Sequence, residues 1–405
     1  MIGPLLLFFT LGQVPNTGQP DTGPRPDTGQ PDAGQPDTGQ RPVTGQPDTG
    51  QPGQPETGHA GQPDTGHAGQ PDMFAPFASG RLQLELEIYA QGRWTPRSGD
   101  DLAELALDRG ELGARVGLLP GVAAAELRVE AIRSAGEGGA LGIDGDTTVI
   151  RVKRAQVLAS HTFGGGVILD GAMGFAADPW IAFVEDGYTV KALSRTGSER
   201  LLAWPTSDLA AVGRVAYGPV RVAVSVGNGE GLQFPERNNG KTTTAMAEVV
   251  AVRESGWRVV VAGVGRDGSI GPALVRDRRL GGGANVVTPY ARGGVELVEA
   301  WGLGDVGEVE GVLVSGWLDV PIVECWFAAG HASTFGFENG SRGRISTFGG
   351  AIGAMPGGPG LGLRVWLAVD RTTTSGTAMA VVGGDGGDAT TFLVIASAIA
   401  PFVME

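Results

Sequence analysis

Apolar and polar residues alternate with a period of two along most of the chain from Arg81 onward. The clearest run places Val220, Val222, Val224 and Val226 between Arg221 and other small or polar residues. Comparable runs begin at Leu82, Leu127 and Leu363. Successive side chains of a strand point to opposite sides of its sheet, so each run predicts a strand with one apolar and one wet face. About sixteen such strands can be counted, which predicts an all-β fold.

The connections between these candidate strands alternate between long and tight, apart from a moderate one at 303–307. Long polar breaks are expected at 91–110, 134–146, 171–209, 228–241, 266–282, 332–342 and 372–388. Tight or compact ones are expected at 119–121, 160–166, 217–219, 254–256, 291–294, 319–321 and 356–362. A transmembrane antiparallel up-and-down β-barrel has this signature: short periplasmic turns, long outer loops and an even strand count. Apolar side chains would face lipid and polar ones a wet interior.

Aromatic residues give this interpretation additional support. Tyr217, Trp257, Tyr290 and Trp317 fall at expected strand ends beside short turns. An interfacial girdle of a membrane barrel places aromatic rings there, although aromatic residues favour strand ends in other β-proteins too.

The connection 171–209 is the longest break in the pattern. It carries apolar residues able to pack, among them Trp180, Ile181, Phe183, Val184 and Tyr188. Loops of this length inside a compact domain are usually functional or disordered. We therefore expect it to fold inward across the mouth of the barrel and to narrow a water-filled pore.

The chain resembles the outer-membrane porins of Gram-negative bacteria, including the phosphate-selective-like branch. The resemblance covers the expected barrel and includes the local sequences Asp178-Pro179-Trp180, 185–188 (EDGY) and 267–271 (DGSIG). It implies passive diffusion of small hydrophilic solutes and ions, a homotrimer, and a third outer loop, here 171–209, folded inward as the constriction. The chain departs from the porin pattern at its end, where Phe402 is followed by Val403-Met404-Glu405 instead of closing the chain as an aromatic residue.

Candidate pore-lining residues follow from the polar strand faces and from the long loop. The strand residues are Arg128, Arg151, Lys153, Arg221 and Arg258, and the loop carboxylates Asp178, Glu185 and Asp186 are expected to face them. Opposed charges of this kind would set a transverse field across the constriction. Lys191, Arg195 and Arg200 would add an anion-attracting edge. The formal net charge of −14 opposes an anion preference, so the ion preference stays open, and ordinary lumen salt bridges are an alternative for every basic residue.

The N-terminal part has a different composition. Residues 1–12 form a short apolar stretch that we interpret as a signal peptide, although it lacks a preceding basic residue. Residues 13–73 repeat TGQPD with small variations and too few apolar side chains to bury a core, so we expect a disordered spacer in the periplasm. The barrel would then occupy 74–405, in the outer membrane.

Other function classes find little support in the sequence. The net charge of −14 argues against nucleic-acid binding, which needs a basic face. The single cysteine, Cys325, is expected within a strand and allows no intrachain disulfide and no cysteine metal cluster. His331 and Ser333 are similar to the pair that outer-membrane barrel phospholipases use, but no orienting partner can be named, so we predict no enzyme, cofactor or metal. The alternative is a surface-displayed β-sandwich that binds or adheres, in which Val220 to Val226 would meet a second sheet.

Overall fold

The computed structural model describes residues 82–95, 102–134, 147–229, 231, 240–270, 274–302, 309–323, 325–338, 342–356, 363–376 and 389–404. The proposed signal peptide, the TGQPD spacer and the first residues of the expected barrel lie outside these ranges. No helix within the described ranges has the length and apolar content needed to cross a membrane.

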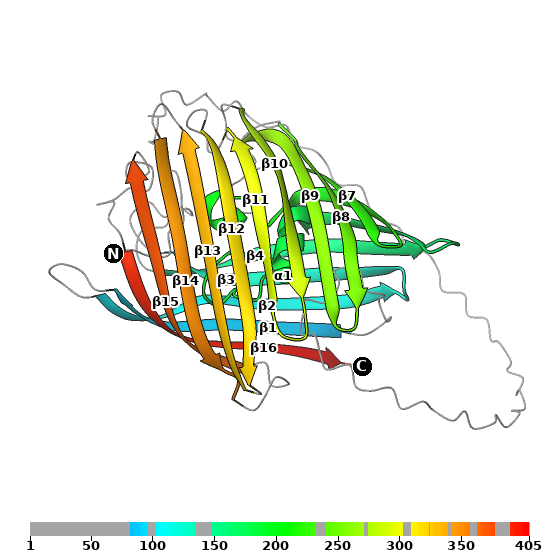
Figure 1. Cartoon of the computed structure of the whole chain (residues 1–405). Helices are drawn as coiled ribbons and strands as arrows, with labels where there is room; N and C mark the ends of the chain where they lie inside the picture. The colour runs from blue at the N-terminus through cyan, green and yellow to red at the C-terminus, as the bar shows by residue number, and fades with distance from the viewer. Residues whose placement is uncertain are drawn as a thin grey trace, which may run out of the picture. The chain divides into compact units, whose positions relative to one another are not determined.

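Within these ranges, sixteen antiparallel strands form one closed barrel, and each pairs with its neighbours in the sequence (Figure 1). The first eight are β1 (Leu82–Thr95), β2 (Leu102–Leu119), β3 (Ala123–Ser134), β4 (Thr147–Thr162), β5 (Val167–Ala177), β6 (Ser207–Tyr217), β7 (Val220–Gly227) and β8 (Thr242–Glu254). The others are β9 (Trp257–Ile270), β10 (Val275–Val287), β11 (Arg292–Trp301), β12 (Glu310–Val323), β13 (Trp326–Glu338), β14 (Arg342–Ala354), β15 (Leu363–Gly376) and β16 (Ala389–Met404). The predicted fold class and strand count are confirmed.

The barrel closes where β1 pairs with β16. Leu82 lies opposite Met404, so the first strand begins and the last strand ends at the same end of the barrel. This is also the end of the tight turns, such as the one that joins Tyr217 to Val220. A closed ladder pairs every strand on both sides and leaves no sheet edge to cover.

The outward face of the barrel is apolar and exposed. Val220, Val222, Val224 and Val226 are 43–48 % exposed, whereas Ala223 and Ser225 between them are buried. No second sheet covers these valines, because all described strands belong to the one barrel. The alternative of a β-sandwich is therefore wrong.

Several expected connections are shorter than the pattern indicated. Strand β9 runs to Ile270 and β10 begins at Val275, and β13 runs to Glu338 with β14 beginning at Arg342. Strict alternation of long and short connections is thus wrong at these two places, because Gly and charged residues that looked like loop continue the strands. Cys325 was expected within a strand, but it lies exposed in the turn between β12 and β13.

The inward face is less uniformly polar than expected. A buried apolar cluster includes Leu313, Phe327, Phe335, Trp366 and Ile395, which lie on β12, β13, β15 and β16. Phe327 and Trp366 pack edge to face with ring centroids 4.5 Å apart. The strict rule of polar residues inside therefore fails on this part of the wall, where apolar side chains pack against each other and against the long connection between β5 and β6.

That connection covers 178–206, so the expected span of 171–209 was too wide at both ends. It contains α1 (Pro179–Gly187) and α2 (Gly197–Leu201). Asp178 caps α1 by accepting hydrogen bonds from the backbone N–H groups of Trp180 and Ile181, and Pro179 occupies the first turn, where no N–H is needed. Thr196 and Glu199 form a capping box at α2. Residues 178–206 are called the long loop below.

Candidate functional site

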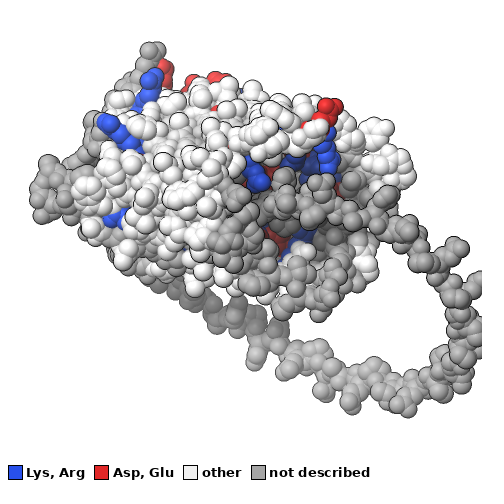
Figure 2. Space-filling model, turned by 60° about the horizontal axis from the view of Figure 1, so that its bottom comes forward, with Lys and Arg blue, Asp and Glu red and all other residues white. Residues whose placement is uncertain are grey.

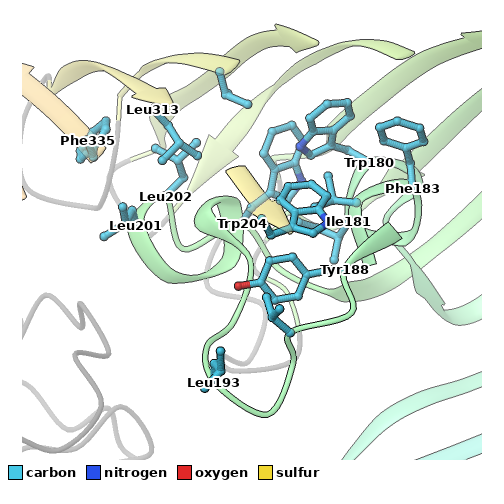
Figure 3. Packing of buried hydrophobic residues seen from close by; sticks show 14 of the residues in the cluster. Trp180, Ile181, Phe183, Tyr188, Leu193, Leu201, Leu202, Trp204, Leu313 and Phe335 are labelled. Carbon is cyan, nitrogen blue, oxygen red and sulfur yellow. The ribbon is translucent and has the colours of Figure 1, made fainter. Parts of the chain in front are cut away.

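The long loop contacts side chains on the inward face of the barrel. Its first helix packs against β7, β8, β10 and β11, and its second against β12 and β13. Figure 3 shows Trp180, Phe183 and Trp204 gathered beside the wall, with Leu201 and Leu202 near Leu313 and Phe335. Most of these apolar loop residues are almost fully buried. The apolar content of the loop thus serves to pack it against the barrel.

Glu185 of α1 reaches the opposite part of the wall, on β4. Its carboxylate lies 3.4 Å from Lys153 Nζ and accepts a hydrogen bond from Arg154 Nη2 at 3.2 Å. Lys153 also donates to Glu111 of β2 at 2.9 Å. Four charged groups from two strands and the loop therefore meet in a buried network, in which each charge has a partner.

A β-bulge explains how two adjacent basic residues both point inward. In the pairing of β3 with β4, Arg128 lies opposite Arg154 but Val129 lies opposite Val152, so Lys153 is the extra residue. Both Lys153 and Arg154 are buried, whereas alternation alone would place one of them outside. The bulge thus doubles the positive charge that faces Glu185.

Strand carboxylates neutralise the remaining predicted cations of this region. Arg128 pairs with Glu85 at 2.5 Å and with Glu111 at 3.1 Å. Arg151 pairs with Glu130 at 2.7 Å. Neither arginine contacts the loop carboxylates that the sequence pattern set against them, because glutamates of the adjoining strands are closer.

Asp178 connects the start of the long loop to β8 and β9. Its second carboxylate oxygen accepts from Thr244 Oγ1 at 3.1 Å and from Arg266 Nη1 at 3.4 Å. Arg266 also donates to Asp277 at 3.0 Å, and Asp277 pairs with Arg279. Asp178 is one of the predicted site residues, whereas Arg266, Asp277 and Arg279 are not.

The second helix is held by β11 and β15. Ser198 donates to Glu296 through its backbone N–H at 3.1 Å and through its hydroxyl at 2.6 Å. Arg200 contacts Asp370 at 3.5 Å and donates to Thr372 at 3.1 Å. Arg200 is therefore a bridge from the loop to the wall of the barrel.

The other predicted residues lie at more accessible positions. Arg221 pairs with Glu248 at 3.1 Å, and Arg258 lies 3.5 Å from Asp186, with both side chains of that second pair more than a third exposed. Lys191 and Arg195 are half-buried in the loop. The outer wall in Figure 2 is largely uncharged, and basic and acidic side chains show in a hollow on the end turned toward the viewer.

The prediction that Trp317 belongs to an interfacial aromatic girdle is wrong. It lies inside β12, is buried, and donates its indole N–H to the Gly187 carbonyl at 2.8 Å while packing 5.1 Å from the Tyr188 ring. Tyr217, Trp257 and Tyr290 are exposed beside tight turns, as expected for a girdle. Trp317 instead fastens the end of α1.

The charge of Glu185 is resistant to acid. Burial acts to raise its pKa, but the positive charges of Lys153, Lys191 and Arg154 outweigh burial and lower the pKa to about 2. A carboxyl with a depressed pKa contributes stability that is present above its unfolded value of 4.5 and is lost as the pH falls through about 2.

We therefore expect the Glu185 contacts to persist from neutral pH down to about pH 4. Trp180 and Trp204 are the buried tryptophans of the long loop, and their fluorescence reports whether the loop is docked. Titration of Glu185 should not change this fluorescence between neutral pH and about pH 4. The variant Glu185→Gln provides the comparison. A loss of the loop signal between pH 7 and about pH 4 in the wild type alone would contradict the assignment.

Some signal for the missed residues exists in the sequence. Arg266, Asp277 and Arg279 alternate correctly for the inward faces of β9 and β10, but the Gly-rich and charged composition of 266–282 predicts a long loop there and hides this pattern. The bulge at Lys153 and the contact of Glu296 with Ser198 depend on tertiary structure and leave no local pattern.

Comparison with known proteins places the fold. No protein-family model matches the sequence, and no curated protein is similar enough to count as a relative. The outer-membrane expressed OmpT of Vibrio cholerae superposes with a TM-score of 0.53 at 9 % identity, over 79 % of this chain and 97 % of that chain. A trimer form of OmpT gives 0.52 at 12 % identity, over 79 % and 99 %.

An anion-selective porin from Comamonas acidovorans gives a TM-score of 0.53 at 11 % identity, over 79 % of this chain and 99 % of that chain. Identities this low concern the fold alone. Nearly the whole length of each of these proteins is matched, so the likeness extends around the complete barrel. The chain has the closed sixteen-strand barrel fold of Gram-negative outer-membrane porins.

Proposed function

We propose that the protein is an outer-membrane porin, a water-filled channel for passive diffusion of small hydrophilic solutes and ions. The observation that carries this proposal is a closed sixteen-strand barrel with an exposed apolar outer face and charged side chains on its inner face. Barrels of this strand number are wide enough to leave an aqueous channel inside. The apolar outer face suits lipid, because the closed ladder satisfies the backbone groups.

The long loop is proposed as the constriction of this channel. Glu185 reaches β4, whereas Ser198 and Arg200 reach β11 and β15, so the loop contacts distant parts of the inner wall. A segment held in this way takes up cross-section that would otherwise be open. Its charged residues and the strand cations opposite them would set the field that solutes meet.

Solute flux tests the channel. The protein, reconstituted in liposomes, should admit small uncharged sugars and exclude larger ones, with swelling rates that fall steeply with solute size. Migration on an unboiled gel that changes on heating would report the folded barrel in the same preparation. A folded barrel that admits no solute would overturn the proposal.

The selectivity role of Arg151 can be tested by charge reversal. Arg151→Glu would place a carboxylate next to Glu130, which Arg151 neutralises at 2.7 Å. We expect the reversal potential in a salt gradient to shift toward cation preference. Arg276→Glu is the matched control, because Arg276 is 63 % exposed and lies away from the loop contacts. Equal reversal potentials for wild type and Arg151→Glu would remove this residue from the selectivity field.

Outer-membrane lipid and diffusing solutes are the proposed partners, with the N-terminal repeat in the periplasm. A homotrimer is supported by the likeness to the trimer form of OmpT and is testable by the mass of the protein in mild detergent. We keep the prediction that the protein is not an enzyme. His331 lies 3.2 Å from Asp370, while the Ser333 hydroxyl donates to Ser315, so these described residues form no serine–histidine pair.

A further inference from the structure

We infer that the buried pair Arg266 and Arg279, joined by Asp277, is the positioning centre that fixes both ends of the constriction. The inference rests on the proposed function, since it assigns the residues that hold the long loop in the channel. These three residues, called the arginine clamp, come from the inward faces of β9 and β10. None of them belongs to the site that the sequence pattern predicted.

The clamp holds the beginning of the loop through Asp178. Arg266 Nη1 lies 3.4 Å from one carboxylate oxygen of Asp178, and the other oxygen caps α1. Asp178 therefore links the first helical turn directly to β9. Because its two oxygens serve two different partners, a shift of Arg266 would also disturb the start of the helix.

The clamp holds the end of the loop through Trp204. The Arg279 guanidinium lies 4.9 Å from the centroid of the Trp204 ring, and the Arg266 guanidinium lies 5.8 Å from it. Cation–π contacts of this kind strengthen where water is excluded, and Trp204 is only 1 % exposed. Trp180, two residues after Asp178, packs 6.1 Å from the same ring.

Two features show that the arrangement is specific to this point of the wall. The backbone N–H of Asp178 donates to the Thr206 carbonyl at 3.1 Å, so the two ends of the loop lie side by side there. Asp277 is fully buried and accepts from both arginines, at 3.0 Å from each. The Asp277 carboxylate thus fixes the spacing of the two guanidinium groups. At that spacing Arg266 reaches Asp178 and Arg279 reaches Trp204.

The geometry assigns different tasks to the clamp and to the Glu185 contacts. Glu185 touches β4 at the far end of α1, where a break would free the middle of the loop only. Loss of the clamp would remove the contacts of Asp178 with β9 and of Trp204 with β9 and β10, whereas the Thr244 contact of Asp178 and the pairing of β5 with β6 would remain. The clamp residues therefore act on the channel through the loop and do not need to touch a solute.

The test uses the full-length protein with the double substitution Asp277→Asn and Arg279→Met, which removes one positive and one negative charge together. It takes away the Arg279 contact with Trp204 and the carboxylate that holds Arg266 beside Asp178. We expect roughly twofold higher single-channel conductance, increased open-channel current noise, and new protease cleavage within the loop. Arg276→Met on the same strand β10 is the matched control, since Arg276 is exposed and pairs with Asp267. That control should behave as the wild type.

A second variant, Trp204→Leu, keeps all clamp charges and removes only the ring on which they stack. It should show the same loop cleavage and current noise as the double variant, with unchanged heat-modifiable migration. Trp257→Leu, which removes an exposed ring, is the control and should show neither the cleavage nor the noise. Arg279→Lys retains the positive charge without the planar guanidinium group. Its loop cleavage and current noise should therefore lie between those of the wild type and those of the double variant. If the wild type conducts but the double variant and Trp204→Leu both match it, the clamp inference is overturned while the channel stands. If the wild type does not conduct, the proposed function fails, and loop cleavage alone then decides the clamp.

Discussion

Excision of the long loop should raise single-channel conductance several-fold. The variant replaces residues 179–205 with a short glycine–serine linker and keeps Asp178 and Thr206, whose backbones already pair. Removing α1 and α2 takes away the segment that contacts β4, β11 and β15 at once. A sixteen-strand barrel without such a segment is wide inside, so we expect an increase of about threefold or more.

The barrel itself should survive this excision, because strands β5 and β6 are paired along their whole length, from Val167 opposite Tyr217 to Ala177 opposite Ser207. Heat-modifiable migration is the control for folding. The excised variant also leaves the apolar residues around Leu313 and Phe335 without their loop partners, so some loss of thermal stability is expected. A well-folded variant whose conductance equals that of the wild type would remove the loop from the constriction.

Exchanging the charges of Lys153 and Glu185 should show that their contact docks the loop. Lys153→Glu would gather carboxylates at positions 111, 153 and 185, and Glu185→Lys would gather cations at 153, 154 and 185. Breaking a buried pair by changing one partner costs about 3–5 kcal/mol of stability. We expect each single variant to lose loop docking. The double variant Lys153→Glu with Glu185→Lys should recover only part of it, because the exchange restores the attraction between positions 153 and 185 but sets like charges against Glu111 and Arg154.

Loop docking in this series can be followed by protease cleavage within 188–196 and by the fluorescence of buried Trp180. Arg258→Glu with Asp186→Arg is the matched control, because that pair is exposed and lies at 3.5 Å. Exposed pairs contribute only about 0–1 kcal/mol, so the control swap should change little. Additive effects in the Lys153 and Glu185 series, with no recovery in the double variant, would show that the two residues act independently.

The strands could be predicted from the sequence because lipid and the lumen impose a simple rule on them. The alternate valines between positions 220 and 226 must point outward once the barrel is closed, and the structure exposes them as predicted. The loop helices have a local origin too, since Asp178-Pro179 and Thr196 with Glu199 are cap signals. The position of the long loop between β5 and β6 followed from its length alone.

The details of the site were harder to predict because they depend on register. One extra residue at Lys153 turns Arg154 inward, and no pattern in the sequence marks that bulge. Arg266 and Arg279 were missed because their strands run through a Gly-rich and charged stretch that looks like a loop. Trp317 was assigned to the membrane girdle because it precedes a short turn, whereas its strand continues to Val323 and turns the ring inward.

The inner wall also departs from the expected pattern for a physical reason. Leu313 and Phe335 are apolar because they pack against the loop near Leu201 and Leu202, as Figure 3 shows. A barrel wall that packs against a folded loop needs an apolar surface for that contact, in addition to charges. Alternation therefore predicts which way a side chain points better than it predicts whether that side chain meets water.

Current through a planar lipid bilayer tests the account most directly. Purified full-length protein should insert in discrete steps, each of which conducts with a current proportional to voltage, as expected for an open hydrated path. Folded, heat-modifiable protein that inserts without any conductance, at any voltage the bilayer tolerates, would contradict a channel and leave the barrel without its proposed function.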